Sequence, residues 1–489
     1  MERNRRNSRE EEESSTNWGL WGGIGVGVAA AAGALYYIAT RNRETVLEQQ
    51  PDQRRRLEAI DFSQHQQQVP MIRYESGLQL QGDLPGNQGI NNLNSLLNDI
   101  YVRYTGVKKD DFQLHYSVFY RIFNRLHQKM KDVDKYYNRY SSTVQITGSH
   151  SDKLRIKKPD EFDMDIVIKL PLSIKQNPYN VNDSDFIIEP KDAGFVYLKM
   201  GVQYDKLPMR DGGSNWDINK TAYKWSDDYG YLLRSKFTDW FKGVVVKALN
   251  QFEKNENGYT VFEVDGVEYS IGRSESGPAV TLHIFNRLRK FKMDVDLVPA
   301  LKFPEERWPP GPDYRDIPYN CRKAYWMVVP KPNKRSQYEA PQTRSWRIAM
   351  YNQESELLNN TNHLRQAIKL VKKFRDAQNM DPIASYYIKT LAFWEIVRIQ
   401  DNDPEYWQRS PAEIFKLFVQ RFHEAMVKGS IPYFWNENEN LIGGIHRQAL
   451  NMFAAKLRRF ITVLDNLNYK EVAKFLLTTE EFAEYEIYL

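Results

Sequence analysis

The feature that most constrains this chain is a pair of segments in which acidic and apolar residues alternate. In the first segment Glu161, Asp163 and Asp165 are separated by single large apolar residues, and in the second Asp294 and Asp296 repeat the pattern. Successive side chains of a β-strand point to opposite faces, so the acids of each segment share one face and the apolar residues share the other. The sequence therefore predicts two strands, each acidic on one face and backed by the core on the other.

Two such strands offer what a hard divalent cation needs. Mg²⁺ takes carboxylate oxygens together with substrate phosphates, and a pair of ions can hold the attacking and leaving oxygens of a phosphoryl transfer. We therefore interpret the chain as a nucleotidyltransferase that uses two Mg²⁺ or Mn²⁺ ions. The expected catalytic and metal-binding acids are Glu161, Asp163 and Asp296, with Asp165 and Asp294 as reserve acids.

A glycine–serine turn supports this interpretation against a simpler one. Alternating acids on a single strand usually mark a solvated sheet face. Here Gly148 and Ser149 come before the first acidic strand, and a small, accessible turn can donate backbone hydrogen bonds to a phosphate tail. The turn, the second acidic strand and the apolar backing of both strands together favour a metal site.

Composition bounds the other functions. The chain has 489 residues, of which 41% are hydrophobic, as in a folded protein of more than one domain. The net charge of +5 permits contact with nucleic acid or an anionic membrane and argues for neither. A single cysteine, Cys321, excludes an internal disulfide and a cysteine-rich zinc site within one chain.

The N-terminal segment differs in kind from the rest. Residues 18–40 carry no charge, have tryptophans near one end and tyrosines near the other, and match the about 20 apolar residues that span a bilayer core. A signal peptide fits poorly because the apolar run is too long and glutamates precede it, and a flexible Gly/Ala arm is the other alternative. We predict a polar N-terminus over 1–17, a single-pass membrane anchor over 18–40 and a flexible linker over 41–89. The catalytic part would face the cytosol from the mitochondrial outer membrane or the endoplasmic reticulum.

Hydrophobic periodicity divides the remaining residues into two parts. Helical spacing runs from Asn91 to Asp134 and from Tyr231 to Phe252, and becomes almost continuous after Ser345. Strands are expected near 143–147, 161–170 and 291–298. We therefore predict an α+β, bilobal fold after a single transmembrane helix. It has a mixed-sheet catalytic lobe over 90–342 and a helical lobe over 343–489, with the active site in the cleft between them.

Several segments, in order from about residue 90 to the C-terminus, resemble cyclic GMP-AMP synthase and the cyclic GMP-AMP synthase-like receptors of animals, above all the insect type. The segments are Thr147-Gly-Ser149, Glu161-Phe-Asp163, Asp296-Leu-Val-Pro-Ala-Leu301, Ser345-Trp-Arg347, Glu354 with Leu357-Leu-Asn-Asn360, Ala367-Ile-Lys369-Leu370 and Ser385-Tyr-Tyr-Ile-Lys389-Thr390. The resemblance implies the same two-lobed fold and the same three metal-binding acids.

The resemblance also implies the nucleotide contacts. Ser149, beside Gly148, would hold a triphosphate, and Arg347 would contact a purine. Glu354 would lie near the nucleotide, and Lys369 and Ser385 would contact the ATP phosphates. Without the order of the family segments, a lobe-bridging ion pair would be the better interpretation of Arg347. An ordinary helix surface would likewise be the better interpretation of Lys369 and Ser385.

The implied reaction is stepwise. A ribose hydroxyl of one nucleotide attacks the α-phosphate of another, pyrophosphate leaves, and a second attack closes a cyclic dinucleotide from ATP and GTP. Asp296 or Asp294 could accept the hydroxyl proton transiently, because a carboxylate beside two cations stays ionised.

Two departures from the family bear on the activator and the product. Cyclic GMP-AMP synthase carries a Cys/His zinc insertion after its Leu-Leu-Asn-Asn stretch, whereas here Asn360 runs directly into Thr361. This implies no zinc, and it favours double-stranded RNA, or another ligand, over double-stranded DNA as the trigger of an innate antiviral response. Two base-contacting positions after Arg347 are Ala349 and Tyr351 here, which leaves the second base of the product open.

The predicted anchor, a third departure, favours a function of another class. Mitochondrial dynamics proteins resemble this layout and act as non-catalytic membrane adaptors. A fold can thus be retained after its catalytic activity is lost. The intact acids favour the enzyme. Contacts to nucleic acid are open, since basic residues on two predicted helices are more often a solvated face than a phosphate track. These residues are Arg121, Arg125, Lys129 and Lys131, then Lys236, Lys242 and Lys247. The sequence leaves the oligomeric state open.

Overall fold

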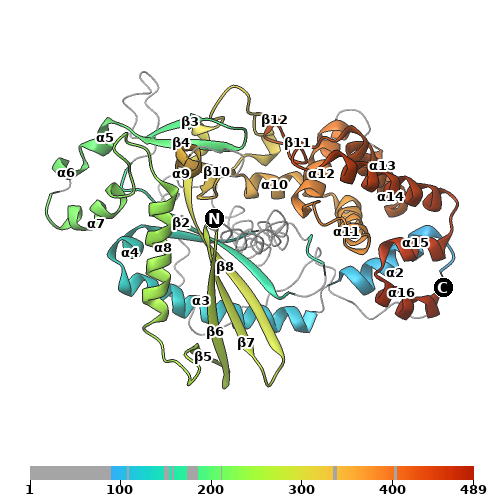
Figure 1. Cartoon of the computed structure of the whole chain (residues 1–489), viewed down its shortest axis with the longest axis horizontal. Helices are drawn as coiled ribbons and strands as arrows, with labels where there is room; N and C mark the ends of the chain where they lie inside the picture. The colour runs from blue at the N-terminus through green and yellow to red at the C-terminus, as the bar shows by residue number, and fades with distance from the viewer. Residues whose placement is uncertain are drawn as a thin grey trace, which may run out of the picture.

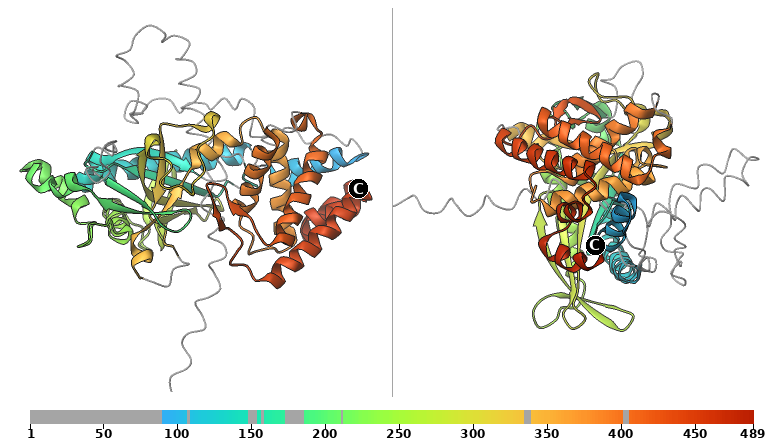
Figure 2. Two further views of the ribbon diagram at one scale, coloured as in Figure 1. Left: turned by 90° about the horizontal axis from the view of Figure 1, so that it is seen from above. Right: turned by 90° about the vertical axis from the view of Figure 1, so that its right-hand side faces the viewer.

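The computed structural model describes most of the chain from residue 90 onward. The described residues are 90–106, 109–147, 154–156, 159–172, 186–210, 212–333, 339–400 and 405–489. A mixed β-sheet flanked by helices forms one part, and a mainly helical part that contains the C-terminus lies beside it (Figure 1 and the left view of Figure 2). This confirms the predicted combination of an α+β part with a helical C-terminal part.

Ten strands of the described residues form one sheet, in which β2 also pairs with β8 and β1 pairs with β2. The order of the other strands is β3-β4-β10-β9-β8-β7-β6-β5. The strands are β1 (Ser141–Thr147), β2 (Glu161–Ile168), β3 (Phe186–Pro190), β4 (Phe195–Met200), β5 (Thr260–Val264), β6 (Val267–Ser276), β7 (Ala279–Asn286), β8 (Phe291–Pro304), β9 (Tyr325–Val329) and β10 (Ser345–Ala349). The β2–β8 pair is parallel, and the other pairs of this sheet are antiparallel.

Helices cover the apolar face of the acidic strands. On β2, Phe162 and Met164 are buried, and the ring of Phe162 stacks on that of Phe119 with 4.7 Å between centroids. Phe119 belongs to α3, whose apolar residues recur at helical spacing and therefore face the sheet together. The helices of this part are α3 (Lys109–Val133), α4 (Lys135–Tyr140), α5 (Val202–Asp205), α6 (Leu207–Arg210), α7 (Ser214–Tyr223), α8 (Arg234–Leu249) and α9 (Glu339–Arg344).

The helical part combines C-terminal helices with one helix from the start of the described chain. Helix α2 packs against α11, α13 and α15 (Figure 1). The helices are α2 (Leu93–Thr105), α10 (Tyr351–Leu357), α11 (Asn362–Ala377), α12 (Ser385–Gln400), α13 (Pro411–Lys428), α14 (Arg447–Asp465), α15 (Tyr469–Leu476) and α16 (Thr479–Tyr485). A short hairpin of β11 (Pro432–Tyr433) and β12 (Asn436–Asn440) connects α13 to α14.

The limits of α13 follow from its sequence. The Ser410 hydroxyl accepts a hydrogen bond from the Glu413 N–H, and the Glu413 carboxylate accepts one from the Ser410 N–H, so the first turn is capped reciprocally. Gly429 ends the helix with a φ of 72°, a left-handed conformation that favours glycine. The hairpin begins directly after this glycine.

Most of the predicted elements are confirmed, and two sets are corrected. The broken helix between Asn91 and Asp134 is α2 and α3, the helix from Tyr231 is α8, and the three predicted strands are β1, β2 and β8. The segment after Ser345 is less helical than predicted. Strand β10 starts at Ser345 and completes the sheet, and β11 and β12 interrupt the helices.

The predicted single-pass membrane localisation is contradicted. No helix among the described residues is long and apolar enough to cross a bilayer. The expected anchor at 18–40, the polar residues 1–17 and the linker over 41–89 all lie outside the described residues.

The turn before β4 yields a prediction about packing. Gly194 has a φ of +80°, and a Cβ built there would lie 2.6 Å from Nη1 of Arg347. Gly230 has a φ of +81° with open space around its Cβ position. Both Gly→Ala variants should lose roughly 1–2 kcal/mol of unfolding free energy through backbone strain. Gly194→Ala should lose more than Gly230→Ala in urea unfolding, because Arg347 must also move. Equal losses would contradict the close packing at Arg347.

Candidate active site

The parallel pairing of β2 with β8 brings four carboxylates onto one face of the sheet. Asp163 lies opposite Asp296, and Glu161 lies opposite Asp294. Residues opposite each other on neighbouring strands point to the same side, so all four acids share a face. The two predicted strands are therefore neighbours, although about 130 residues separate them in the sequence.

Three of the four acids, Asp296, Asp294 and Glu161, have a local partner. The Thr281 hydroxyl donates to Asp296 Oδ1 at 2.5 Å. His283 Nδ1 lies 2.8 Å from Asp294 Oδ1, and Lys292 Nζ lies 3.6 Å from Asp294 Oδ2. Across the pair, Arg155 approaches the Glu161 carboxylate at 3.5 Å. Strand β7 therefore positions Asp296 and Asp294, and the chain before β2 positions Glu161.

Two of these acids are held against ionisation. Burial, followed by the charge of nearby Asp296, raises the pKa of Asp163 well above its usual range, although Arg155 opposes the shift. Burial also raises the pKa of Asp296, and the hydrogen bond from Thr281 acts in the other direction. A like charge nearby disfavours ionisation, so a cation at this face would relieve both acids.

Asp165 continues the acidic face of β2 but lies deeper. It is 2% exposed, burial raises its pKa to about 8, and its Oδ2 has no hydrogen-bond partner among the described residues. Beyond it, the same face turns apolar at Val167, which packs with Ala300 and Ala349. Asp165 therefore lies between the carboxylate face and a small apolar cluster.

The donor set fits a hard divalent cation that substrate helps to bind. No group of three or more His, Cys, Asp or Glu side chains is converged enough to enclose a metal among the described residues. Mg²⁺ usually keeps several waters and takes one or two carboxylates together with substrate phosphates, so an all-protein cage is not expected. Asp163 and Asp296, in register and with raised pKa values, supply such a pair of carboxylates.

Arg347 lies on β10 between aromatic rings from both parts of the molecule. Its guanidinium is 5.1 Å from the Phe195 ring centroid on β4 and 4.8 Å from that of Tyr433 on β11. The ring faces attract the cation and hold its plane. The pKa of Arg347 is raised, because nearby Tyr433, Tyr386 and Glu439 outweigh the opposing effect of burial.

Glu354, on α10, is a buried hub between helices. Its Oε1 accepts hydrogen bonds from the Tyr386 hydroxyl at 2.8 Å and from Trp435 Nε1 at 3.2 Å. Its Oε2 accepts one from Lys389 Nζ at 2.9 Å, and both members of this ion pair have side chains 3% exposed. Both carboxylate oxygens are thus satisfied within the protein, and they fix the ring of Tyr386 on α12.

Two lysines on α11 are buried where the helix approaches the chain before β2. Lys369 is 4% exposed and lies 5.2 Å from the Tyr101 ring centroid, and Lys372 donates to the Leu154 carbonyl at 2.8 Å. Burial lowers the pKa of Lys369 to about 8 and that of Lys372 to about 7. Leu154 closely follows the predicted Gly148–Ser149 turn, which itself lies outside the described residues.

Ser385 and Tyr351 have surroundings that the sequence did not indicate. Ser385 begins α12, where its hydroxyl accepts a hydrogen bond from Arg375 Nη1 at 2.8 Å. Burial and the charges of nearby Asp165, Glu354 and Asp163 raise the pKa of Tyr351 well above its usual value.

Sequence reasoning missed Lys372, Tyr386 and Tyr433. Spacing of three residues from Lys369 on one helix could have indicated Lys372. Tyr386 stands next to Ser385 in a segment that was noted for its family resemblance, but its ring gave no signal of its own. Tyr433 belongs to a hairpin that was predicted to be helical, so no pattern pointed to it.

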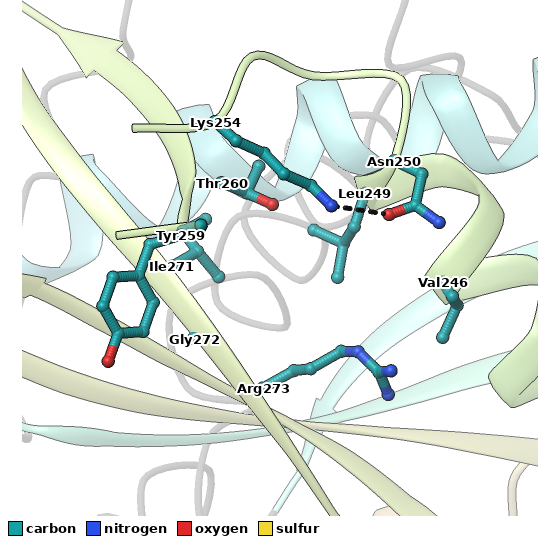
Figure 3. A pocket seen from close by; sticks show the side chains of 10 residues that line it. Val246, Leu249, Asn250, Lys254, Tyr259, Thr260, Ile271, Gly272 and Arg273 are labelled. Atoms are coloured by element: carbon teal, nitrogen blue, oxygen red, sulfur yellow. Dashed lines mark hydrogen bonds between the residues drawn. The ribbon is translucent and has the colours of Figure 1, made fainter. Parts of the chain in front are cut away.

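A separate cavity of about 320 Å³ lies near the end of α8, away from the acids. Lys254 and Arg273 approach it from different sides, and Lys254 Nζ donates to Asn250 Oδ1 at 3.2 Å (Figure 3). Arg273 also pairs with Glu275 at 2.9 Å. None of the acids predicted to be catalytic lines this cavity.

Comparisons with known proteins agree with this geometry. A family model described as the Mab-21 protein nucleotidyltransferase domain matches residues 150–360, and one described as the Mab-21 protein HhH/H2TH-like domain matches residues 363–459. A cyclic GMP-AMP synthase-like receptor of Ctenocephalides felis is 32% identical over 400 residues, which cover 80% of this chain and 89% of the relative. A receptor of the same name from Tribolium castaneum is 31% identical, over 80% of this chain and 94% of the relative. One from Aethina tumida is 29% identical, over 80% of this chain and 93% of the relative. The chain belongs to the cyclic GMP-AMP synthase-like receptor family of nucleotidyltransferases.

Proposed function

We propose that this protein joins ATP and GTP into a cyclic dinucleotide messenger in innate antiviral defence. The observation that carries the proposal is the parallel register that sets Asp163 beside Asp296 on one sheet face. Proteins of this family are nucleotidyltransferases, and such enzymes use divalent metals. The names of the relatives, cyclic GMP-AMP synthase-like receptor, support a cyclic product.

In the proposed reaction, Glu161, Asp163 and Asp296 hold two Mg²⁺ or Mn²⁺ ions, with Asp294 in reserve. When bound, the ions would supply charge neutralisation at the transferring phosphate. Thr281 keeps one oxygen of Asp296 fixed through its hydrogen bond, so the other oxygen remains for the cation. Asp165, buried with a raised pKa, is proposed to stay protonated and to support the face from below.

Substrate recognition is proposed to use the other cluster. Lys369 and Lys372 on α11, with Ser385 and the Gly148–Ser149 turn, would contact the triphosphate. Arg347 would present its edge to a purine because Phe195 and Tyr433 cover its faces. Tyr386, half-buried and fixed by Glu354, offers a ring for base stacking. Glu354 itself is proposed to orient these groups rather than to contact the nucleotide.

Double-stranded RNA is the proposed trigger, because α10 leads to α11 through a few residues and leaves no room for a zinc-binding insertion. The basic residues of α3 and α8, for which the sequence left nucleic-acid contact open, are in part paired within the protein. Arg121 pairs with Asp265, Arg125 donates to the Glu263 carbonyl, and Lys242 pairs with Glu275. The experiment below therefore tests double-stranded RNA and double-stranded DNA separately.

The deciding experiment incubates the full chain with labelled ATP and GTP, Mn²⁺, and double-stranded RNA, double-stranded DNA or neither. Asp163→Asn should lower product formation by roughly a thousandfold, because a metal ion contributes several kcal/mol of charge stabilisation. Asp165→Asn should keep activity within about tenfold of wild type, a difference of about 1.4 kcal/mol.

Chromatography of the product, before and after phosphatase treatment, identifies the cyclic linkage. A protein that binds nucleotide but forms no product in any arm would favour the adaptor class. Equal losses in the two aspartate variants would contradict the assignment of ligands.

A second prediction concerns stability without metal. A carboxyl group whose pKa is raised by folding stabilises the protein fully only below its unfolded pKa, and this contribution is lost as the pH rises. In EDTA, Asp163→Asn should therefore raise Tm at pH 7.5 by roughly 2–4 °C, the change that about 1 kcal/mol produces in a domain of this size. The gain should shrink toward pH 4.

Differential scanning fluorimetry at a series of pH values from about pH 4 to pH 8 measures this change in Tm. Mn²⁺ should stabilise the wild type and not the variant. Asp132→Asn, which removes an exposed carboxylate paired with Lys129, serves as the control and should leave Tm unchanged. A lower Tm for Asp163→Asn in EDTA would contradict the raised pKa.

A third prediction concerns protons taken up with the nucleotide. Near pH 8 most Lys372 side chains are neutral, since burial lowers their pKa to about 7. A bound triphosphate favours the charged amine, so binding of MgATP should draw in a proton. Lys372→Met should take up fewer protons, by up to about one per nucleotide.

Calorimetry in two buffers of different ionisation enthalpy measures the uptake as the difference in binding heat. Lys416→Met, which removes an amine paired with Asp465 on the surface, is the matched control and should behave as wild type. Identical proton uptake by wild type and Lys372→Met would place Lys372 outside the phosphate site.

A further inference from the structure

Arg315 connects the sheet part to the helical part through contacts with two aromatic rings. It lies in the segment between β8 and β9, and both of these strands belong to the sheet. Its guanidinium is 4.5 Å from the ring centroid of Trp394 on α12 and 4.7 Å from that of Phe434 in the turn of the β11–β12 hairpin. The two rings pack edge-on against each other, with 5.3 Å between centroids, so the guanidinium lies over the corner that they form. Attraction to both rings holds the cation in place. The sheet part therefore places one cation against two aromatic residues of the helical part.

The backbone of Arg315 adds two further ties at the same place. Its N–H donates to the Trp435 carbonyl at 3.0 Å, and its carbonyl accepts a hydrogen bond from Trp308 Nε1 at 3.0 Å. Its Nη2 also reaches Glu437 Oε1 at 3.3 Å. Trp394 Nε1 donates to the Pro432 carbonyl at the start of the hairpin. The hairpin is thus held at its beginning, its turn and its second strand.

The residues next to this contact lead to Arg347 from two directions. Tyr433, one residue before Phe434, covers one face of Arg347, and Trp435, one residue after it, donates to Glu354. On the sheet side, Tyr314 precedes Arg315, and its hydroxyl accepts a hydrogen bond from Gly194 N–H, beside Arg347. A shift of Arg315 would therefore move both walls around Arg347.

We propose that Arg315 is a positioning residue that fastens the β11–β12 hairpin to the sheet part and thereby sets the orientation of Arg347 at the base end of the nucleotide site. The inference rests on the proposed function in one respect, the purine contact of Arg347. Arg315 has no contact with the acidic face in the described residues, so it acts on binding and leaves the phosphoryl-transfer step to the acids.

The first readout needs no nucleotide. Amide hydrogen exchange is followed for the hairpin, residues 431–442, in the wild type and in Arg315→Ala. The variant should exchange faster throughout the hairpin while the strands β2 and β8 keep their protection. Arg322→Ala is the matched control, because Arg322 lies in the same segment, is 60% exposed and reaches only Glu305 at 3.7 Å. Unchanged exchange of the hairpin in Arg315→Ala would overturn the proposal.

The second readout is the equilibrium affinity for fluorescent ATP and GTP analogues, together with kcat and KM. Arg315→Ala should weaken the binding of at least one nucleotide by about tenfold, the scale of a desolvated cation–π contact, with kcat within about threefold. Arg315→Lys keeps the charge but not the planar guanidinium, so it should restore only part of the affinity.

The two readouts separate failure of this inference from failure of the proposed function. Faster exchange with unchanged affinity would show that the hairpin does not position Arg347, and would overturn the proposal. A loss of kcat without a change in affinity would overturn it as well. A wild type that binds no nucleotide would refute the proposed function, and the exchange data alone would then decide whether Arg315 holds the hairpin.

Discussion

The whole account depends on the register between β2 and β8. Because these strands are parallel and in the observed register, Asp163 faces Asp296 and Glu161 faces Asp294. A shift of one residue would direct each acid toward the core, where Phe162 and its neighbours now pack against α3. The buried apolar face thus fixes the position of the acids more strongly than the acids themselves could, since their mutual repulsion opposes the arrangement.

The proposed site has an acidic end and a basic, aromatic end, and different parts of the chain build them. Strands of the sheet supply the carboxylates, whose pKa values are raised first by burial and then by neighbouring carboxylates. Helix α11 supplies lysines whose pKa values are lowered first by burial and then by neighbouring arginines. A buried carboxylate or a buried lysine is costly to keep charged without a partner of opposite charge. A metal-bound triphosphate would supply both partners, because the metal would bind the carboxylates and the phosphates would bind the lysines. Arg347 and the Glu354 hub form the proposed base side of this site.

Much of the catalytic face could be predicted from the sequence, because alternation along a strand is a local signal and its physical cause is local too. The placement of Asp163 and Asp296 on one strand face was predicted in this way, and so was the helical periodicity of α3 and α8. Thr281 reaches Asp296 only through the pairing of β7 with β8, and Arg155, six residues before Glu161, stands in a segment without a periodic pattern, so neither partner could be inferred. The β11–β12 hairpin was missed because its strands are short and polar, and buried Lys372 because a helix lysine is normally solvated. The membrane assignment was wrong because it rested on apolar composition at 18–40 and had no support from the described helices.

The most direct test of the central claim is anomalous X-ray scattering from crystals grown with Mn²⁺ and a non-hydrolysable ATP analogue. The account predicts manganese peaks at the sheet face between β2 and β8, coordinated by Asp163 and Asp296 together with phosphate oxygens, with Asp165 uncoordinated behind them. If the analogue is bound and no manganese peak lies at this face, or the peaks lie elsewhere, the claim that the β2–β8 register builds the metal site would be contradicted.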